Sequence, residues 1–229
     1  MLKHKYPVFI FFVLLAILFF TKASILFYVL LFLSFLAITT CGAFDIRLNY
    51  FTKAICKGNS IHKKNIAITF DDGPHEKTSE ILDVLMKYNA KATFFCIGKQ
   101  IEKHPEILKR ILNEGHNIGN HSYSHSKWNG FFSTQKIVSE IEHTNTLVSK
   151  LSNKKIRLFR PPFGVTNPNI ARAVVKTNQI VIGWNIRSLD TVIESENDIL
   201  NRIKNRLKPG GIILLHDTSA KTVSVLEQL

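Results

Sequence analysis

The chain has 229 residues, a formal net charge of +13 and three cysteines. Three cysteines make no disulfide framework, which excludes the small secreted proteins that disulfides hold together. The charge fits attraction to an anionic surface and equally fits an ordinary lysine-rich surface, but nucleic acid is not an expected partner because no basic helix or platform of stacking aromatic residues accompanies it.

The first 45 residues form a hydrophobic segment in which we predict a membrane anchor. Apolar residues run almost unbroken from Pro7 to Thr40, and Lys22 is the only charged residue among them. A run of this length is enough to cross a bilayer, which takes about 20 residues. A cleaved signal peptide is the weaker interpretation, because the run is too long and no small-x-small cleavage site follows it.

The number of spans decides which side of the membrane the rest of the chain faces. The segment can be a single span, or a hairpin of two short helices at residues 8–20 and 25–38. Lys3 and Lys5 favour a cytoplasmic N-terminus, so one span places the following domain outside the cytoplasm and a hairpin returns it inside. We expect a membrane-anchored protein in which the domain that follows the anchor is extracytoplasmic.

After a linker at residues 46–63, the remaining residues, 64–229, form one domain in which strands and helices alternate. This alternation is typical of a parallel sheet in an α/β fold, although it leaves open whether the sheet is open or closed. Strands are predicted at residues 66–70, 92–97, 117–119, 156–159, 179–184 and 211–215, and helices at residues 78–88, 105–114, 134–151, 169–176 and 198–207, with a last helix near Leu229.

Polar residues follow the predicted strands at the point where each strand ends. The carboxyl ends of parallel strands meet at one face, where active sites form. Each group alone has an ordinary structural explanation, such as a turn, a surface histidine or an ion pair, but their joint occurrence on one face favours a site. The residues concerned are Asp71, Asp72, His121, His125, Arg160, Asp190 and His216.

Two of these groups have a spacing that indicates particular chemistry. Asp71 and Asp72 are adjacent carboxylates after a strand, and His121 and His125 are four residues apart. Four residues are about one helical turn, so we expect such a turn to aim both imidazoles at one point, as in zinc sites.

The motifs that contain these residues resemble those of the polysaccharide deacetylases, the NodB homology domain or carbohydrate esterase family four. TFDDGP at residues 69–74 is similar to the first motif of that family, HSYSH at 121–125 to the second, RPPFG at 160–164 to the third and LLH at 214–216 to the fifth. The resemblance covers essentially the whole region after the linker. It implies a distorted (β/α) barrel with seven strands.

The resemblance also implies a metal site and a base. Asp72, His121 and His125 are expected to bind a divalent metal, with zinc as the expected ion. Asp71 is expected to be the general base that activates the attacking water, and Arg160 to fix its orientation. Three protein ligands that leave an open coordination position suit metal-assisted hydrolysis.

The remaining site residues are expected to serve the substrate and the leaving group. By the same resemblance, His216 is the general acid and Asp190 the carboxylate that keeps its imidazole charged. The backbone N–H of Phe163 is expected to stabilise the oxyanion. Trp184 and Leu214 are expected to line the substrate pocket.

Two features depart from the family pattern. The fourth motif commonly carries two aspartates and a tryptophan, but here Arg187 and Thr191 occupy two of those places. Loss of that tryptophan removes a wall of the acetyl pocket. Family members also commonly continue through a further strand, so we expect that the sequence is truncated after Leu229.

The expected function is hydrolysis of N-acetyl groups on N-acetylhexosamine residues of an envelope or chitin-like glycan. The glycan is therefore the expected partner, together with the membrane. The alternatives are deacylation of a lipid-linked sugar or an O-acetyl ester, and a non-catalytic glycan-binding module.

Overall fold

The computed structural model describes residues 3–59, 65–152 and 155–229. Its strands are β1 (Ala54–Ile55), β2 (Ala67–Asp71), β3 (Ala92–Cys96), β4 (Asn117–Asn120), β5 (Leu158–Phe159), β6 (Ile180–Ile182), β7 (Ile186–Arg187) and β8 (Ile212–His216). Its α-helices are α1 (Lys5–Phe20), α2 (Ile25–Phe44), α3 (Glu76–Lys87), α4 (Gly98–Lys103), α5 (Pro105–Asn113), α6 (Thr134–Ser152), α7 (Pro168–Lys176), α8 (Glu196–Lys204) and α9 (Ala220–Gln228). Short 3₁₀ turns lie at Ile46–Leu48, Asn129–Phe131 and Pro162–Gly164.

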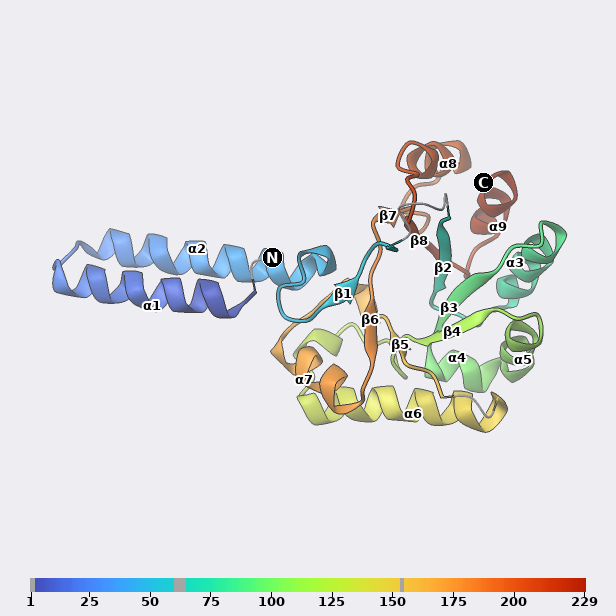
Figure 1. Cartoon of the computed structure of the whole chain (residues 1–229), viewed down its shortest axis with the longest axis horizontal. Coiled ribbons are helices and arrows are strands. Elements are labelled where there is room, and N and C mark those ends of the chain that lie inside the picture. The colour runs from blue at the N-terminus through green and yellow to red at the C-terminus, as the bar shows by residue number, and fades with distance from the viewer. Residues whose placement is uncertain (1–2, 60–64, 153–154) are drawn as a thin grey trace.

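The strands form one parallel sheet in the order β1-β6-β5-β4-β3-β2-β8-β7. The sheet curls, with α3 to α9 around its outside (Figure 1). Within the described residues, β1 and β7 form the two edges and do not pair with each other, so the barrel is incomplete. The parallel (β/α) fold predicted from the alternating pattern is confirmed.

In the part of the chain that the structure describes, the sheet contains eight strands, which corrects the expected count of seven. The additional edge strand, β1, comes from residues that we expected to be linker, and Ala54 in it pairs with Val181 of β6. Ile46, also in that stretch, is buried in the core with 2% of its surface exposed. Two-residue strands carry no periodicity, which is why the sequence did not indicate β1.

Local signals in the sequence explain where the helices begin and end. His75 caps the N-terminus of α3, because its side chain accepts a hydrogen bond from the Lys77 N–H. The Thr78 hydroxyl in turn accepts a hydrogen bond from the His75 N–H. Pro105 occupies the first turn of α5, where its missing N–H costs nothing. Gly115, with φ of +77°, follows the end of α5, a conformation that glycine adopts without strain.

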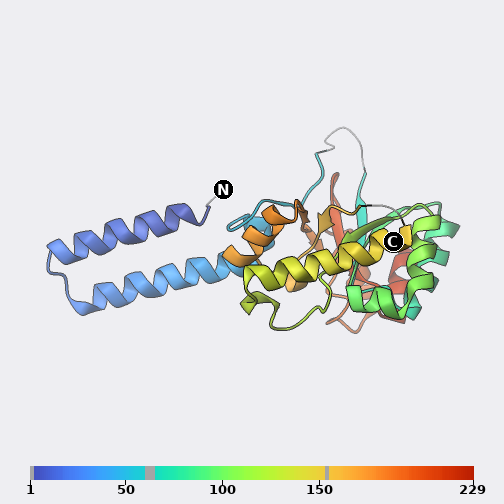
Figure 2. The same cartoon turned by 90° about the horizontal axis from the view of Figure 1, so that it is seen from below.

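The first two helices form an antiparallel hairpin that projects from the domain (Figures 1 and 2). Among the described helices, α2 is long and apolar enough to cross a membrane, judged by length and composition, whereas α1 is a shorter apolar helix of 16 residues. Both expose large apolar side chains along their length, Phe9, Phe20 and Phe32 among them. Exposure of so many apolar side chains to water is unfavourable.

Specific contacts join the hairpin to the domain. His4 donates its backbone N–H to the carbonyl of Tyr50 at 3.0 Å, and Thr166 donates its N–H to the carbonyl of Ala43 at 2.9 Å. The ring of Tyr50 lies so close to Gly42 that a β-carbon there would overlap it. The start of α1 and the end of α2 therefore lie at the same side of the domain.

Candidate active site

The polar residues singled out in the sequence gather at one edge of the sheet. Asp71 and His216 are the last residues of β2 and β8, which pair directly with each other. His121 directly follows β4 and Arg160 directly follows β5. Because the strands are parallel, these positions share the edge at which ligands bind in α/β proteins.

A cavity of about 290 Å³ lies at this edge. Arg160 and Asp190 lie behind its wall, where each is hydrogen-bonded to a residue that faces the cavity. The cavity is lined by Asp71, Asp72, His121, His125, Phe163, Gly164, Trp184, Arg187, Thr191, Leu214 and His216. The structure thus brings the predicted site residues together around a single space.

Asp72, His121 and His125 form a ligand set that fits a divalent metal. One ligand atom from each residue lies within 4.8 Å of the others. The Nε2 atoms of His121 and His125 face Asp72 Oδ1 at 3.5 and 3.4 Å. This oxygen is buried and has no hydrogen-bond partner in the described part of the chain, so a cation would satisfy it. A carboxylate and two imidazoles are an established donor set for catalytic metals.

The state of His121 suits this role. Its Nδ1 lies 2.7 Å from the carbonyl oxygen of Arg160, which can only accept, so the proton is on Nδ1 and the lone pair of Nε2 faces Asp72. Burial lowers the pKa of His121 to about 3, so the ring is neutral at neutral pH. A neutral imidazole is the form that binds a metal.

The backbone that presents the two histidines is a loop, which corrects the expected helical turn. Ser122 and His125 have positive φ values of 64° and 46°, and the His125 N–H donates to Ser122 Oγ at 3.1 Å. The Ser122 N–H donates to the side chain of Asn120 at 2.8 Å. The imidazole centroids still lie 4.9 Å apart, because these bonds hold the loop in a conformation that non-glycine residues adopt at a cost.

Asp71 is held by Arg160 in the interior of the sheet. Arg160 Nη1 donates to Asp71 Oδ1 at 2.6 Å, and its guanidinium lies 4.0 Å from the centroid of the Phe95 ring. Its other donors reach the carbonyls of Ile182 and Gly183. Burial raises the pKa of Asp71 above its usual value, and the charge of Arg160 partly opposes that rise. The result is a carboxylate with one oxygen fixed and a greater affinity for protons than in water.

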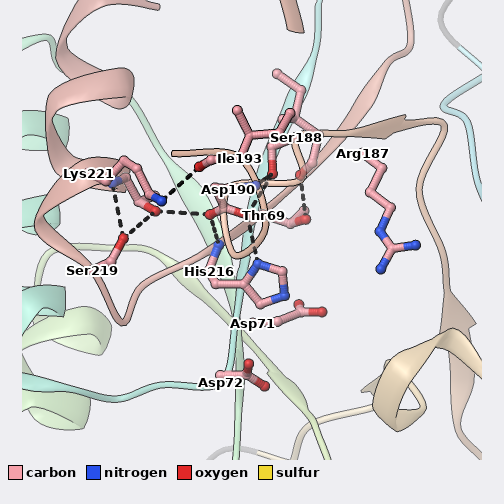
Figure 3. Close-up of polar contacts among 12 residues, drawn as sticks. Thr69, Asp71, Asp72, Arg187, Ser188, Asp190, Ile193, His216, Ser219 and Lys221 are labelled. Atoms are coloured by element: carbon pink, nitrogen blue, oxygen red, sulfur yellow. Dashed lines mark hydrogen bonds and ion pairs between the residues drawn. The ribbon is translucent and has the colours of Figure 1, made fainter. Parts of the chain in front are cut away.

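His216 and Asp190 form a second charged pair at this edge of the sheet (Figure 3). His216 Nδ1 lies 2.8 Å from Asp190 Oδ1, and the His216 N–H donates to Asp190 Oδ2 at 2.7 Å. Burial alone would lower the pKa of His216, but the hydrogen bond and charge of Asp190 outweigh it and raise that pKa to about 9. The imidazole is therefore protonated at neutral pH, the state that a general acid requires.

Three residues that support the site were not identified in the sequence. Thr69 Oγ1 accepts from Arg160 Nη1 at 2.8 Å and donates to the carbonyl of Ile213 at 2.6 Å. Ser188 and Thr222 donate to Asp190 at 2.7 and 2.9 Å. Thr69 and Ser188 lie within the motifs, whereas Thr222 is in α9 and only the tertiary fold brings it to Asp190.

The expected substrate-binding residues form the apolar wall of the cavity. Phe163 has φ of 60°, and its ring lies 4.7 Å from that of His125. Its N–H forms no hydrogen bond with any residue of the described ranges and so is available to a ligand. Trp184 packs so closely on Gly164 that a β-carbon there would overlap the indole, and Leu214 is buried.

The carboxyl of Asp217 lies against the backbone at Gly73, next to Asp72. It is buried and accepts from Thr78 Oγ1 at 2.6 Å, while its Oδ2 would lie 2.1 Å from a β-carbon placed on Gly73. Burial raises the pKa of Asp217 to about 7, although the Thr78 bond opposes this. Only glycine fits between this carboxyl and the strand end.

Comparison with known proteins agrees with these features. The sequence model described as polysaccharide deacetylase matches residues 58–181. The chain belongs to the polysaccharide deacetylase family. It is 37% identical over 158 residues to a peptidoglycan-N-acetylglucosamine deacetylase of Bacillus cereus, covering 69% of this chain and 57% of the relative.

A second relative is similar in both sequence and structure. The chain is 34% identical over 169 residues to the peptidoglycan-N-acetylmuramic acid deacetylase PdaC of Bacillus subtilis, covering 73% of this chain and 35% of the relative. The solved structure of that deacetylase matches with a TM-score of 0.69 at 33% identity, over 73% of this chain and 81% of the solved one. The family resemblance recognised in the motifs is thus confirmed, while the chain spans only part of the length of these curated relatives.

Proposed function

We propose that this chain is a metal-dependent hydrolase that removes N-acetyl groups from N-acetylhexosamine residues of a cell-envelope glycan. The observation that carries the proposal is the placement of two charged pairs around one ligand set. Asp71 with Arg160 and His216 with Asp190 both adjoin the cavity that Asp72 faces. The relatives named as peptidoglycan deacetylases support a cell-wall substrate.

The metal is proposed to be zinc, held by Asp72, His121 and His125, because one carboxylate and two imidazoles suit that ion. When bound, it supplies Lewis acidity toward the acyl carbonyl. Asp71, with one oxygen fixed by Arg160, takes the proton from the attacking water. The Phe163 N–H stabilises the negative charge that develops on the carbonyl oxygen.

His216 completes the reaction as the general acid. Hydrolysis of an amide expels an amine, which is a poor leaving group unless its nitrogen is protonated. The imidazolium that Asp190 maintains supplies this proton, and the apolar side chains of Trp184 and Leu214 bound the acyl group. Base and acid thus have partners of opposite charge: Asp71 is paired with the cation Arg160, and His216 is paired with the anion Asp190.

The test is acetate release by the purified, zinc-loaded full chain in detergent. Peptidoglycan and N-acetylglucosamine oligomers are the substrates, and loss of activity on chelation with recovery on zinc addition is expected. Absence of acetate from both, combined with hydrolysis of acetyl esters, would refute the N-deacetylase assignment. An Asp198→Asn variant, which changes an exposed carboxylate on α8, serves as a matched control.

We also propose that residues 1–45 anchor the chain in a membrane and that residues 64–229 form the catalytic domain. At 1.5 Å per residue the 20 residues of α2 extend about 30 Å, which matches the hydrocarbon thickness of a bilayer. The catalytic domain is proposed to face the outside, where cell-wall glycans lie. In that orientation both helices of the hairpin, α1 and α2, would enter the membrane from its extracytoplasmic side.

A lipid-linked amino sugar is the second candidate substrate, and two observations favour it. The first observation is that Lys3, Lys5 and Arg47 lie on the same side of the hairpin as the domain, a distribution that favours a cytoplasmic location for that side under the positive-inside rule. An apolar cavity of about 570 Å³ also lies between Phe44, the last residue of α2, and Phe163 beside the catalytic cavity. A cavity so placed suits the lipid part of a membrane-borne substrate.

A topology reporter fused after Leu229 distinguishes the two candidates. An extracytoplasmic signal supports modification of the finished polymer. A cytoplasmic signal refutes the proposed orientation and favours a lipid-linked precursor, because cell-wall polymer does not occur on that side.

A further inference from the structure

Arg187 has an unusual position at the mouth of the catalytic cavity. It ends β7 and pairs in register with Leu214 of β8, itself a wall of the cavity. Arg202 Nε donates to its carbonyl oxygen at 2.9 Å, which fixes the backbone from which the side chain extends. Figure 3 shows the guanidinium beside the strand ends that carry Asp71 and His216.

The guanidinium of Arg187 has no anionic partner. Within residues 3–59, 65–152 and 155–229 it makes no hydrogen bond or ion pair, and it lies over the Trp184 ring, whose centroid is 6.0 Å away. Arg47 and Arg110, by comparison, pair with carboxylates at 2.7 and 2.6 Å. Arg187 therefore presents its donors to the cavity and to solvent.

The carboxylates around the cavity are already engaged. Asp71 is bonded to Arg160 and Asp190 to His216, while Asp72 faces the two imidazoles of the ligand set. The imidazolium of His216 places a second positive charge on the same wall. None of these carboxylates pairs with Arg187, so an anionic group that binds in the cavity finds an unpaired guanidinium there.

We propose that Arg187 binds an anionic group of the substrate, so that the preferred substrate is an acylated amino sugar carrying a carboxylate or a phosphate. A guanidinium forms two parallel hydrogen bonds with either group. The Trp184 indole supports the guanidinium and leaves its N–H edges free to bind. This inference rests on the proposed deacetylase function, whose substrate it specifies.

Binding measurements test the proposal without depending on turnover. The zinc-loaded full chain in detergent is titrated calorimetrically with N-acetylglucosamine, N-acetylmuramic acid and N-acetylglucosamine 1-phosphate, which are neutral, carboxylate-bearing and phosphate-bearing. We expect at least one of the anionic sugars to bind about 10-fold to 100-fold more tightly than the neutral one, as a charge-assisted bond implies. The tighter of the two identifies which anion the site accepts.

Variants assign the effect to Arg187. Arg187→Gln is expected to remove the preference for the anionic sugars over the neutral one, whereas Arg187→Lys keeps part of it. Arg206→Gln removes the same charge from an exposed arginine that does not line the cavity, and should retain the preference. Equal binding of all three sugars by the unmodified protein, or a preference that survives in Arg187→Gln, would overturn the proposal.

Acetate release from the same sugars separates this inference from the function on which it rests. Release from the neutral and anionic sugars with equal kcat/KM would refute the role of Arg187 and support the deacetylase. An anion preference in binding without acetate release would support Arg187 and refute the deacetylase.

Discussion

The pairing of His216 with Asp190 makes a quantitative prediction for an Asp190→Asn variant. The pair raises the His216 pKa from 6.5 to about 9, which stabilises the protonated folded state by about 3 kcal/mol at roughly 1.4 kcal/mol per pH unit. Because the folded pKa is raised, this stability is fully present below about pH 6.5 and is lost as the pH rises through about 9. Asparagine keeps the shape and removes the charge, so burial should leave the imidazole neutral.

Two assays follow from this. A proton NMR titration of His216 should give a pKa near 9 in the unmodified protein and below 6.5 in Asp190→Asn. In denaturation at pH 6, Asp190→Asn should be less stable than the unmodified chain, and this difference should shrink by about 3 kcal/mol at pH 10. The kcat at pH 7 should fall about 100-fold or more, with partial recovery at pH 5, since a protonated acid is needed.

The reasoning has a clear refutation and a matched control. A His216 pKa that stays near 9 in the variant would show that Asp190 does not maintain the charge. Asp198→Asn removes an exposed carboxylate from α8 and should change neither the titration nor the pH dependence of stability.

Three further substitutions probe other parts of the site. Asp71→Asn should lower kcat about 100-fold or more while zinc affinity by calorimetry is retained; loss of zinc would contradict its role as base. His125→Ala should weaken zinc binding beyond the 10-fold to 100-fold typical of supporting residues, with unchanged circular dichroism; retained affinity would exclude it as a ligand. Gly73→Ala should lower the unfolding free energy by about 1–3 kcal/mol, because its β-carbon would displace Asp217 from Thr78, and an unchanged melting temperature would contradict this.

The sequence was sufficient to predict the parallel fold and the edge of the sheet where the site lies. Long strands such as β2 and β8 carry a continuous apolar pattern, and polar residues directly follow them. Their parallel direction then brings Asp71 and His216 side by side, since these two residues are register partners. The location of a polar residue directly after a strand thus determined its location in the site.

Features that depend on tertiary contacts were not predictable in this way. The edge strands β1 and β7 are two residues long and exist through their pairing with β6 and β8. Thr222 reaches Asp190 from α9, a contact that no local pattern encodes. The loop from His121 to His125 was expected to be helical because spacing alone does not distinguish a helical turn from a loop with positive φ.

The adjacent residues Asp71 and Asp72 show how the backbone separates two identical side chains into different chemical groups. Asp71 is the last residue of β2 and pairs with His216 of β8. Its side chain is buried, and its carboxylate forms an ion pair with Arg160. At Asp72 the chain turns to φ of 77°, which directs the next carboxylate to the two imidazoles. A left-handed conformation is costly for aspartate, and the cost is offset where the turned carboxylate gains a cation. The pattern Asp-Asp after a strand therefore provides a base and a ligand only when the chain turns between them.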